Sequence, residues 1–174
     1  MLSDMLRDLL RREDPLITRM RQIPFFQELK SREIREISKI LNFRTFTAGE
    51  TVFKQGQPGL GMYVMHSGLV EIVQEDEDET KMVLAEISGS SFFGELSLLD
   101  DSPCTASAFA VEESELALFS REDLLTFSEQ KPHLGVKIMM QLSQIVAERL
   151  RRTNRGLRTA REEMERAQES EDSN

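Results

Sequence analysis

The sequence has little of what several classes of protein require. Cys104 is its single cysteine, which excludes an internal disulfide and fits a reducing compartment. It has no run of about 18 apolar residues, so we expect no membrane span. Its 22 Lys and Arg are outnumbered by 31 Asp and Glu, and the net charge of -9 argues against a general nucleic-acid surface. We therefore expect an acidic, cytoplasmic protein.

Side chains that carry out catalysis are also scarce. The two histidines, His66 and His133, are far apart in sequence, whereas a jelly-roll metal enzyme needs several histidines and a carboxylate. Cys104 has no neighbouring histidine to make it a thiolate, and Ser97 is not in a nucleophile-elbow context. We predict that the protein is not an enzyme and that it has no metal site and no cofactor.

Hydrophobic periodicity predicts a β-rich centre between helices. The 174 residues suit one domain. Apolar residues alternate with a period of two over residues 43–119, where short strands are separated by turns that contain glycine. Helical spacing covers residues 16–42, 121–130 and 133–165. The pattern predicts an α+β fold, with an antiparallel β-sandwich or jelly roll flanked by helices.

The chain divides into four segments along its length. They are an N-terminal helical extension (1–22), the β-barrel with its flanking helices (23–131), a long C-terminal helix (132–166) and a disordered tail (167–174). Residues 1–12 are typical of an amphipathic helix, which packs on its own domain or binds a partner. The acidic run 75–79 falls between two strands and is expected to be a solvated hairpin tip.

The stretch FFGELSLLDDSPCTASAFA, residues 92–110, has the features of an anion-binding cradle. Gly94 lets the backbone approach a ligand closely, and the short helical turn over 95–99 offers unpaired N–H groups to a negative charge. The Glu95 carboxylate can accept hydrogen bonds from sugar hydroxyls. The cradle lacks an obvious cation.

This stretch resembles the phosphate-binding cassette of cyclic-nucleotide-binding domains. Residues 56–68, with glycines before and after Tyr63-Val64-Met65, resemble a second signature of that family, in the same order and spacing. The resemblance implies that Glu95 accepts the ribose 2′-OH. It also implies that the phosphate is held by backbone N–H groups of Gly94, Leu96 and Ser97, together with Thr105. One position departs from the family pattern, because Cys104 stands where the family has a phosphate-binding arginine.

The long helix carries a second resemblance. Leu142-Ser143-Gln144, with Thr153-Asn154 further on, is similar to the dimer helix of catabolite activator proteins. That similarity implies that Thr153 and Asn154 contact the adenine of cyclic AMP, the second residue reaching from the partner subunit. An asparagine replaces the family's serine, and its amide can donate and accept hydrogen bonds. A polar pair within a helix seam is the alternative interpretation.

A heptad-like seam runs along the same helix, with Gly156 as a weak point. Its members alternate steps of four and three: Val146, Leu150, Thr153, Leu157, Ala160 and Met164. The seam predicts a parallel homodimer or burial against the chain's own barrel. Six arginines share the helix: Arg149, Arg151, Arg152, Arg155, Arg158 and Arg161. We expect them to form a solvated, salt-bridged face, because too little chain follows for a DNA-binding helix-turn-helix.

Two classes of function follow from these features. One is a sensor that binds a cyclic nucleotide, with cyclic AMP favoured, and signals through a rearrangement of barrel and helix. The other is a dimeric scaffold or adaptor with an unidentified protein partner, which keeps the fold and has lost the ligand. Cys104 decides between the two functions, because it replaces the arginine that would bind the phosphate. Losing a charge-assisted contact to a buried phosphate costs roughly 2–5 kcal/mol. A different small ligand remains a third alternative.

Overall fold

A computed structural model describes residues 15–76, 78 and 80–172 of the chain, so the helix expected over residues 1–12 lies outside the described residues. In the described part, two four-stranded antiparallel sheets form a β-sandwich, with strand orders β1-β8-β3-β6 and β2-β7-β4-β5. The predicted α+β fold is confirmed. The strands are β1 (Asn42–Phe46), β2 (Thr51–Phe53), β3 (Gly61–Ser67), β4 (Leu69–Glu75), β5 (Lys81–Ser88), β6 (Phe92–Phe93), β7 (Ser107–Ala110) and β8 (Ser114–Ser120).

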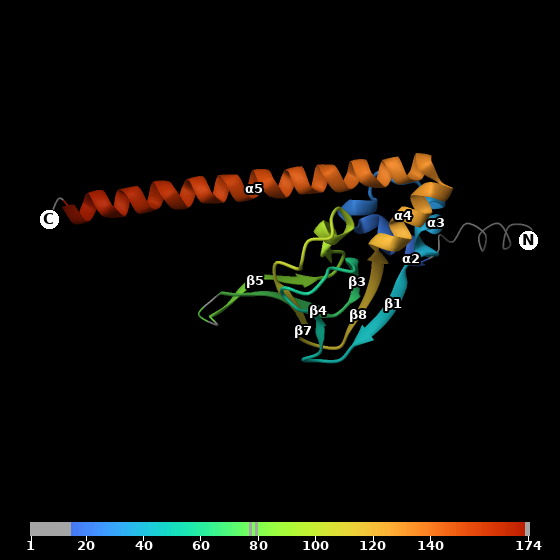
Figure 1. The fold of residues 1–174 in the computed structure, drawn as a ribbon, viewed down its shortest axis with the longest axis horizontal. Coiled ribbons are helices and arrows are strands. Elements are labelled where there is room, and N and C mark those ends of the chain that lie inside the picture. The colour runs from blue at the N-terminus through green and yellow to red at the C-terminus, as the bar shows by residue number, and fades with distance from the viewer. Residues whose placement is uncertain (1–14, 77, 79, 173–174) are drawn as a thin grey trace, which may run out of the picture.

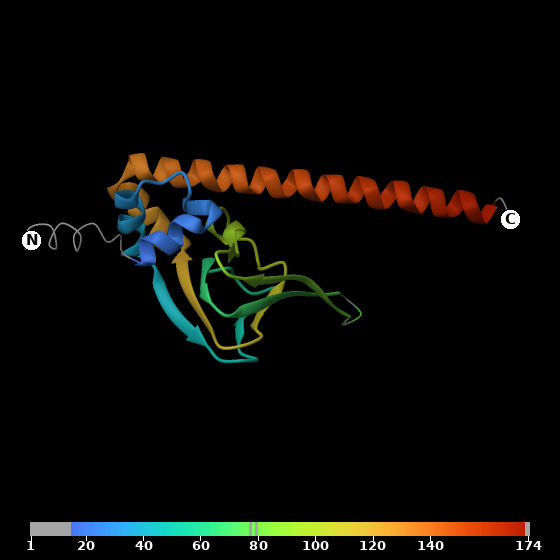
Figure 2. The same ribbon diagram turned by 180° about the vertical axis from the view of Figure 1, so that it is seen from behind.

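Helices gather at one end of the sandwich, as Figures 1 and 2 show from opposite sides. They are α2 (Pro15–Gln22), the 3₁₀ turn η1 (Pro24–Phe26), α3 (Ser31–Ser38), α4 (Arg121–Gln130) and α5 (Pro132–Asp172). A further 3₁₀ turn, η2 (Glu95–Leu98), follows strand β6. Of the acidic run, Glu75 ends β4, and Asp76 and Asp78 lie in the connection to β5, which pairs with β4 as an antiparallel hairpin.

Two apolar clusters hold these layers together. One joins the helices to the sheet and includes Phe25, which is fully buried and whose ring lies 6.1 Å from Phe92 and 6.4 Å from Phe119. The other fills the space between the sheets, where the rings of Tyr63 and Phe93 stack at 5.5 Å. Burial of aromatic side chains supplies much of the apolar contact in such a core. The first cluster therefore fixes the base of α5 against the barrel.

Ion pairs reinforce the junction of α3 with the last two helices. Lys137 Nζ on α5 donates to Glu33 Oε1 at 2.7 Å, and Lys131, between α4 and α5, pairs with Glu36. The Lys137 hydrogen bond lowers the pKa of Glu33, while burial acts in the opposite direction. The Lys131 hydrogen bond likewise lowers the pKa of Glu36, to about 2. Both carboxylates stay charged at neutral pH and hold the start of α5.

Helix α5 spans 41 residues, which at 1.5 Å per residue makes it about 60 Å long. Its second half extends past the barrel, away from the other helices (Figure 1). The helix continues through Gly156 and past residue 166, its predicted end, so residues 167–172 are helical and not part of a disordered tail as predicted. Helix propensity explains the difference, because the good helix formers Ala167, Gln168 and Glu169 follow and no glycine or proline ends the helix there. In the described part of the chain, no helix is long and apolar enough to cross a membrane.

Candidate ligand-binding site

The turn that opens the cradle is built on Gly94. Its φ of 75° lies in the left-handed region that glycine adopts without strain, and η2 begins directly after it. A Cβ at this position would lie 2.9 Å from the carbonyl oxygen of Gly61, so the close approach of strand β3 also requires glycine. The Ser97 N–H donates to the Gly94 carbonyl at 3.1 Å, which closes the turn. That N–H is therefore already used within the chain.

Backbone hydrogen bonds fix the loop that carries Cys104. The Cys104 N–H donates to the Gln57 carbonyl and the Gly56 N–H donates to the Cys104 carbonyl, each at 2.8 Å. Burial raises the pKa of the Cys104 thiol, although a hydrogen bond with the Ser97 hydroxyl opposes the shift. The thiol is consequently neutral at physiological pH, and this loop offers no charge at residue 104.

A cavity of about 650 Å³ separates the cradle from α5. Its volume is within the range of small-molecule sites, which are typically ~300–1,000 Å³. The barrel contributes Phe53, Ile72, Leu84, Ala85, Ile87, Phe93–Ser97, Leu99, Asp100 and Ser102–Ala106, and α5 contributes Arg149, Arg152 and Thr153. All of the predicted site residues except Asn154 line this cavity. The structure thus brings together two segments that lie about fifty residues apart in the sequence.

A buried carboxylate ties the cradle to the helix. Arg149 Nη1 donates to Glu95 Oε1 at 2.5 Å; the Glu95 side chain is 3% exposed and that of Arg149 is 48% exposed. The Arg149 guanidinium also lies over the ring of Phe92, 5.5 Å from its centroid. A charge-assisted bond of this kind compensates for taking the carboxylate out of water. Arg149 therefore closes one side of the cavity.

This contact corrects the prediction that all six arginines form a solvated face. The prediction holds for Arg158 and Arg161, which pair with Glu162 at 2.8 Å and Glu165 at 3.0 Å along the exposed helix. It is wrong for Arg149, because the position of α5 brings its guanidinium onto a buried acid of the barrel. Nothing in its local sequence distinguishes Arg149 from the other arginines, so sequence reasoning missed it.

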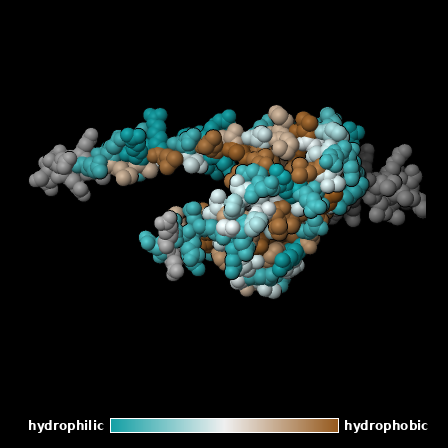
Figure 3. Space-filling view, viewed as in Figure 1, coloured by the Kyte–Doolittle hydropathy of each residue, from teal (hydrophilic) through white to brown (hydrophobic). Residues whose placement is uncertain are grey.

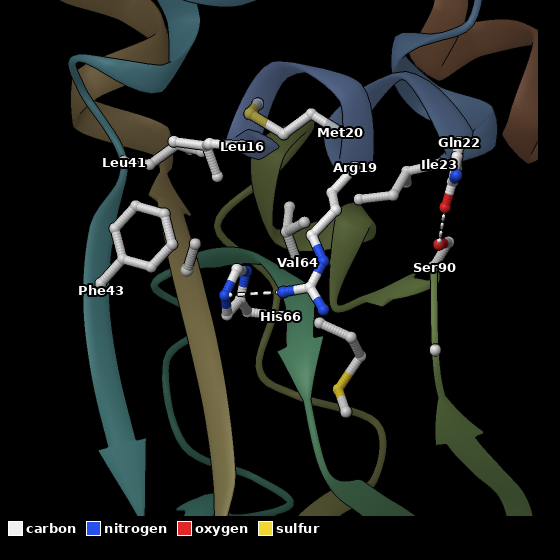
Figure 4. Close-up of a pocket in the computed structure, with 13 residues that line it drawn as sticks. Leu16, Arg19, Met20, Gln22, Ile23, Leu41, Phe43, Val64, His66 and Ser90 are labelled. Atoms are coloured by element: carbon white, nitrogen blue, oxygen red, sulfur yellow. Dashed lines mark hydrogen bonds between the residues drawn. The ribbon is translucent and has the colours of Figure 1, made fainter. Parts of the chain in front are cut away.

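A second, smaller cavity of about 170 Å³ lies between α2 and the sheet (Figure 4). Arg19 reaches into it and donates from Nη1 to His66 Nε2 at 3.0 Å, and the Ser90 hydroxyl donates to Gln22 Oε1 at 3.1 Å. His66 Nε2 is also 3.4 Å from Glu115 Oε2. None of the predicted site residues lines this cavity, and its hydrogen bonds join α2 to strand β3 and to the loop before β6. Among the described residues, no cluster of His, Cys, Asp or Glu is suited to a metal ion.

Comparison with known proteins assigns the barrel to a known family. The family model of the cyclic nucleotide-binding domain matches residues 43–131. The chain is 35% identical over 132 residues to the CRP-like cAMP-activated global transcriptional regulator of Mycobacterium tuberculosis. The aligned residues make up 76% of this chain and 57% of that protein.

Two solved structures share the fold. The catabolite activator protein of Thermus thermophilus superimposes with a TM-score of 0.70 at 31% identity, over 77% of this chain and 61% of that one. The N-terminal domain of a transcriptional regulator from Streptomyces coelicolor gives a TM-score of 0.68 at 31% identity, over 78% and 94%. The chain thus spans little more than half the length of the Mycobacterium regulator and most of the Streptomyces domain.

Proposed function

Because the chain belongs to the cyclic nucleotide-binding domain family, a family of regulatory sensor domains, we propose that its cavity binds a cyclic nucleotide, cyclic AMP above all. One observation carries the proposal: the cradle of residues 94–97 and helix α5 face each other across a cavity large enough for a nucleotide. Apolar side chains from β4 and β5 line it alongside the polar groups, as the base and sugar-phosphate of a nucleotide require.

In this proposal the sugar and phosphate occupy the cradle. Glu95 accepts a hydrogen bond from the ribose 2′-OH while one of its oxygens stays with Arg149. The backbone N–H groups of Gly94 and Leu96 and the Thr105 hydroxyl face the phosphate. The Ser97 N–H, expected to share that task, is occupied by the Gly94 carbonyl, so Ser97 contributes its position rather than its N–H. Thr153 on α5 approaches the base.

In this proposal, ligand binding changes the position of helix α5 relative to the barrel. The ligand contacts the cradle on one side of the cavity and α5 on the other. It therefore stabilises the position of α5 in which both contacts form at the same time. The Glu95–Arg149 bond already links these two sides at 2.5 Å. The ligand therefore acts on the existing junction, and α5 carries the signal away from the barrel.

Helix α5 also offers the surface for a homodimer. Leu150, Leu157 and Met164 lie seven residues apart and are 59%, 66% and 65% exposed, so this part of the seam is not buried against the chain's own barrel. Figure 3 shows apolar patches along the extended half of the helix. A parallel second copy of α5 would cover this face. Asn154, which does not line the cavity of its own chain, would then be placed to reach the ligand of the partner subunit.

Calorimetric titration tests the function directly, with cyclic AMP and cyclic GMP as ligands. Glu95→Ala should weaken binding of cyclic AMP by at least about 1.5 kcal/mol, roughly tenfold. The 2′-deoxy analogue should lose nothing further in that variant, because both changes remove one contact. Glu113→Ala, an exposed acid outside the cavity, is the matched control and should bind like the parent.

Cys104 supports one alternative function, the dimeric scaffold that no longer binds a ligand. That function is favoured if the parent chain gives no heat with either cyclic nucleotide while remaining folded and dimeric. Losses that add up between Glu95→Ala and the 2′-deoxy ligand would show instead that Glu95 holds the helix and does not contact the ribose.

A further inference from the structure

The charges around the large cavity are unevenly distributed between its two sides. On the barrel side the charged lining residues are both acidic, Glu95 and Asp100, and residue 104 is a neutral thiol. Among the described lining residues the basic ones are Arg149 and Arg152, and both belong to α5. An anionic group that enters the cavity therefore finds its positive charge on the helix.

Arg149 is already occupied by contacts within the chain. Its guanidinium donates to the buried Glu95 at 2.5 Å and lies over the Phe92 ring. Moving it to a ligand would leave the Glu95 carboxylate buried without its partner, which is costly. Arg149 thus neutralises Glu95 and adds little net charge to the cavity.

Arg152 is placed differently. It lies three residues further along α5, so it shares a helix face with Arg149 and Thr153. It is exposed, and the structure shows no ion pair or hydrogen bond of its side chain within the described residues. Asp100, the remaining acid of the lining, is exposed and accepts the Ser102 N–H at 3.1 Å. Arg152 is consequently the cation of this lining that a ligand can engage without breaking an existing bond.

We propose that Arg152 supplies the positive charge for the anionic group of the ligand, which is thereby held from helix α5 instead of from the barrel loop. The inference rests on the proposed function, with the cyclic phosphate as the anionic group. It accounts for the neutral Cys104 in an otherwise intact loop, because the cradle needs no arginine of its own when the helix provides one. It also makes the phosphate a direct link between barrel and helix.

Arg152→Gln tests this assignment, with Arg151→Gln as the matched control. Arg151 is also exposed on the same helix but does not line the cavity. Cyclic AMP and adenosine are the two ligands, since adenosine keeps the base and sugar and lacks the phosphate. Arg152→Gln should weaken cyclic AMP binding at least tenfold and leave adenosine binding unchanged. The affinity of the parent for cyclic AMP should fall more steeply with salt than that of Arg152→Gln.

A second-site substitution completes the test. Cys104→Arg places a guanidinium on the opposite wall, in a loop whose backbone hydrogen bonds are already formed. In the Arg152→Gln background it should restore cyclic AMP binding, with circular dichroism confirming that the double variant folds. A parent that binds neither ligand would refute the proposed function and the inference with it. A parent that binds cyclic AMP no better than Arg152→Gln does, or an equal loss for adenosine, would refute the role of Arg152 alone.

Discussion

The bond between Glu95 and Arg149 allows a sharp prediction about the ligand-free chain. Its two side chains are buried to very different extents, 3% exposed for Glu95 and 48% for Arg149. Arg149→Met keeps most of the side chain stem and removes the charge, whereas Glu95→Gln keeps the shape and removes the opposite charge. We expect the first substitution to destabilise the chain more than the second, although both break the same ion pair.

The expected difference follows from what each substitution leaves behind. Breaking a fully buried pair by removing one partner costs about 3–5 kcal/mol, and losing an exposed pair costs about 0.2–1 kcal/mol. Arg149→Met leaves a buried carboxylate beside an open cavity, so its cost should lie between these limits, about 2 kcal/mol. Glu95→Gln leaves an arginine half in water that can still donate to the amide oxygen, so its cost should be about 0.5 kcal/mol.

Thermal and urea unfolding at one protein concentration measure the asymmetry. For a domain of this size about 1 kcal/mol moves Tm by roughly 2–4 °C, so Arg149→Met should lower Tm by about 4–8 °C and Glu95→Gln by about 1–2 °C. The double variant should be less destabilised than the sum of the two, because no buried charge remains unpaired. Equal costs for the two single variants would contradict the argument, since they would mean that water reaches both charges alike.

Three further outcomes follow from the contacts described. Leu150→Asp combined with Leu157→Asp should yield monomers in analytical ultracentrifugation, and an unchanged sedimentation coefficient would place the dimer interface elsewhere. The raised pKa of Cys104 should make alkylation by iodoacetamide slow at pH 7.5 and faster as the pH rises, with cyclic AMP giving protection; fast labelling at pH 7.5 would show a thiolate. Glu33 has a pKa lowered by Lys137, so its contribution to stability is present above the unfolded value of 4.5 and is lost as the pH falls through its folded pKa. The Tm of Glu33→Gln should therefore lie below that of the parent at pH 6, and this difference should shrink as the pH is lowered towards 3. A difference that stays constant with pH would exclude this linkage.

Short-range patterns were enough to predict much of the fold. The period of two over residues 43–119 predicted the part of the chain that carries the strands, observed from Asn42 to Ser120, and helix α4 has the predicted bounds, Arg121–Gln130. Strand β6 could not be predicted in this way, because it is only the pair Phe92–Phe93, too short for any periodicity to appear. The glycine turn and the short helical turn of the cradle were also predicted, since the conformational demand at Gly94 is local.

The bond between Glu95 and Arg149 could not be predicted from the sequence, for a physical reason. Glu95 and Arg149 are 54 residues apart, and their bond depends on where α5 crosses the barrel. In the sequence Arg149 belongs to a charged run in which Arg158 and Arg161 make ordinary pairs four residues along the helix. The packing of the helix against η1 and α4, together with the ion pairs from α3, decides which arginines reach the cavity.

The geometry of α5 makes ligand binding and dimer formation interdependent in the proposed sensor. One face of the helix, with Arg149, Arg152 and Thr153, lines the cavity. The seam that runs through Leu150 and Leu157 adjoins that face, and Thr153 belongs to both. A helix fixed by a ligand on one side presents its neighbouring side in a fixed orientation, which favours pairing with a second copy. By linkage the second copy must favour the ligand by the same factor. A phosphate held from α5 strengthens this coupling, because releasing the ligand then frees the helix that the partner subunit recognises.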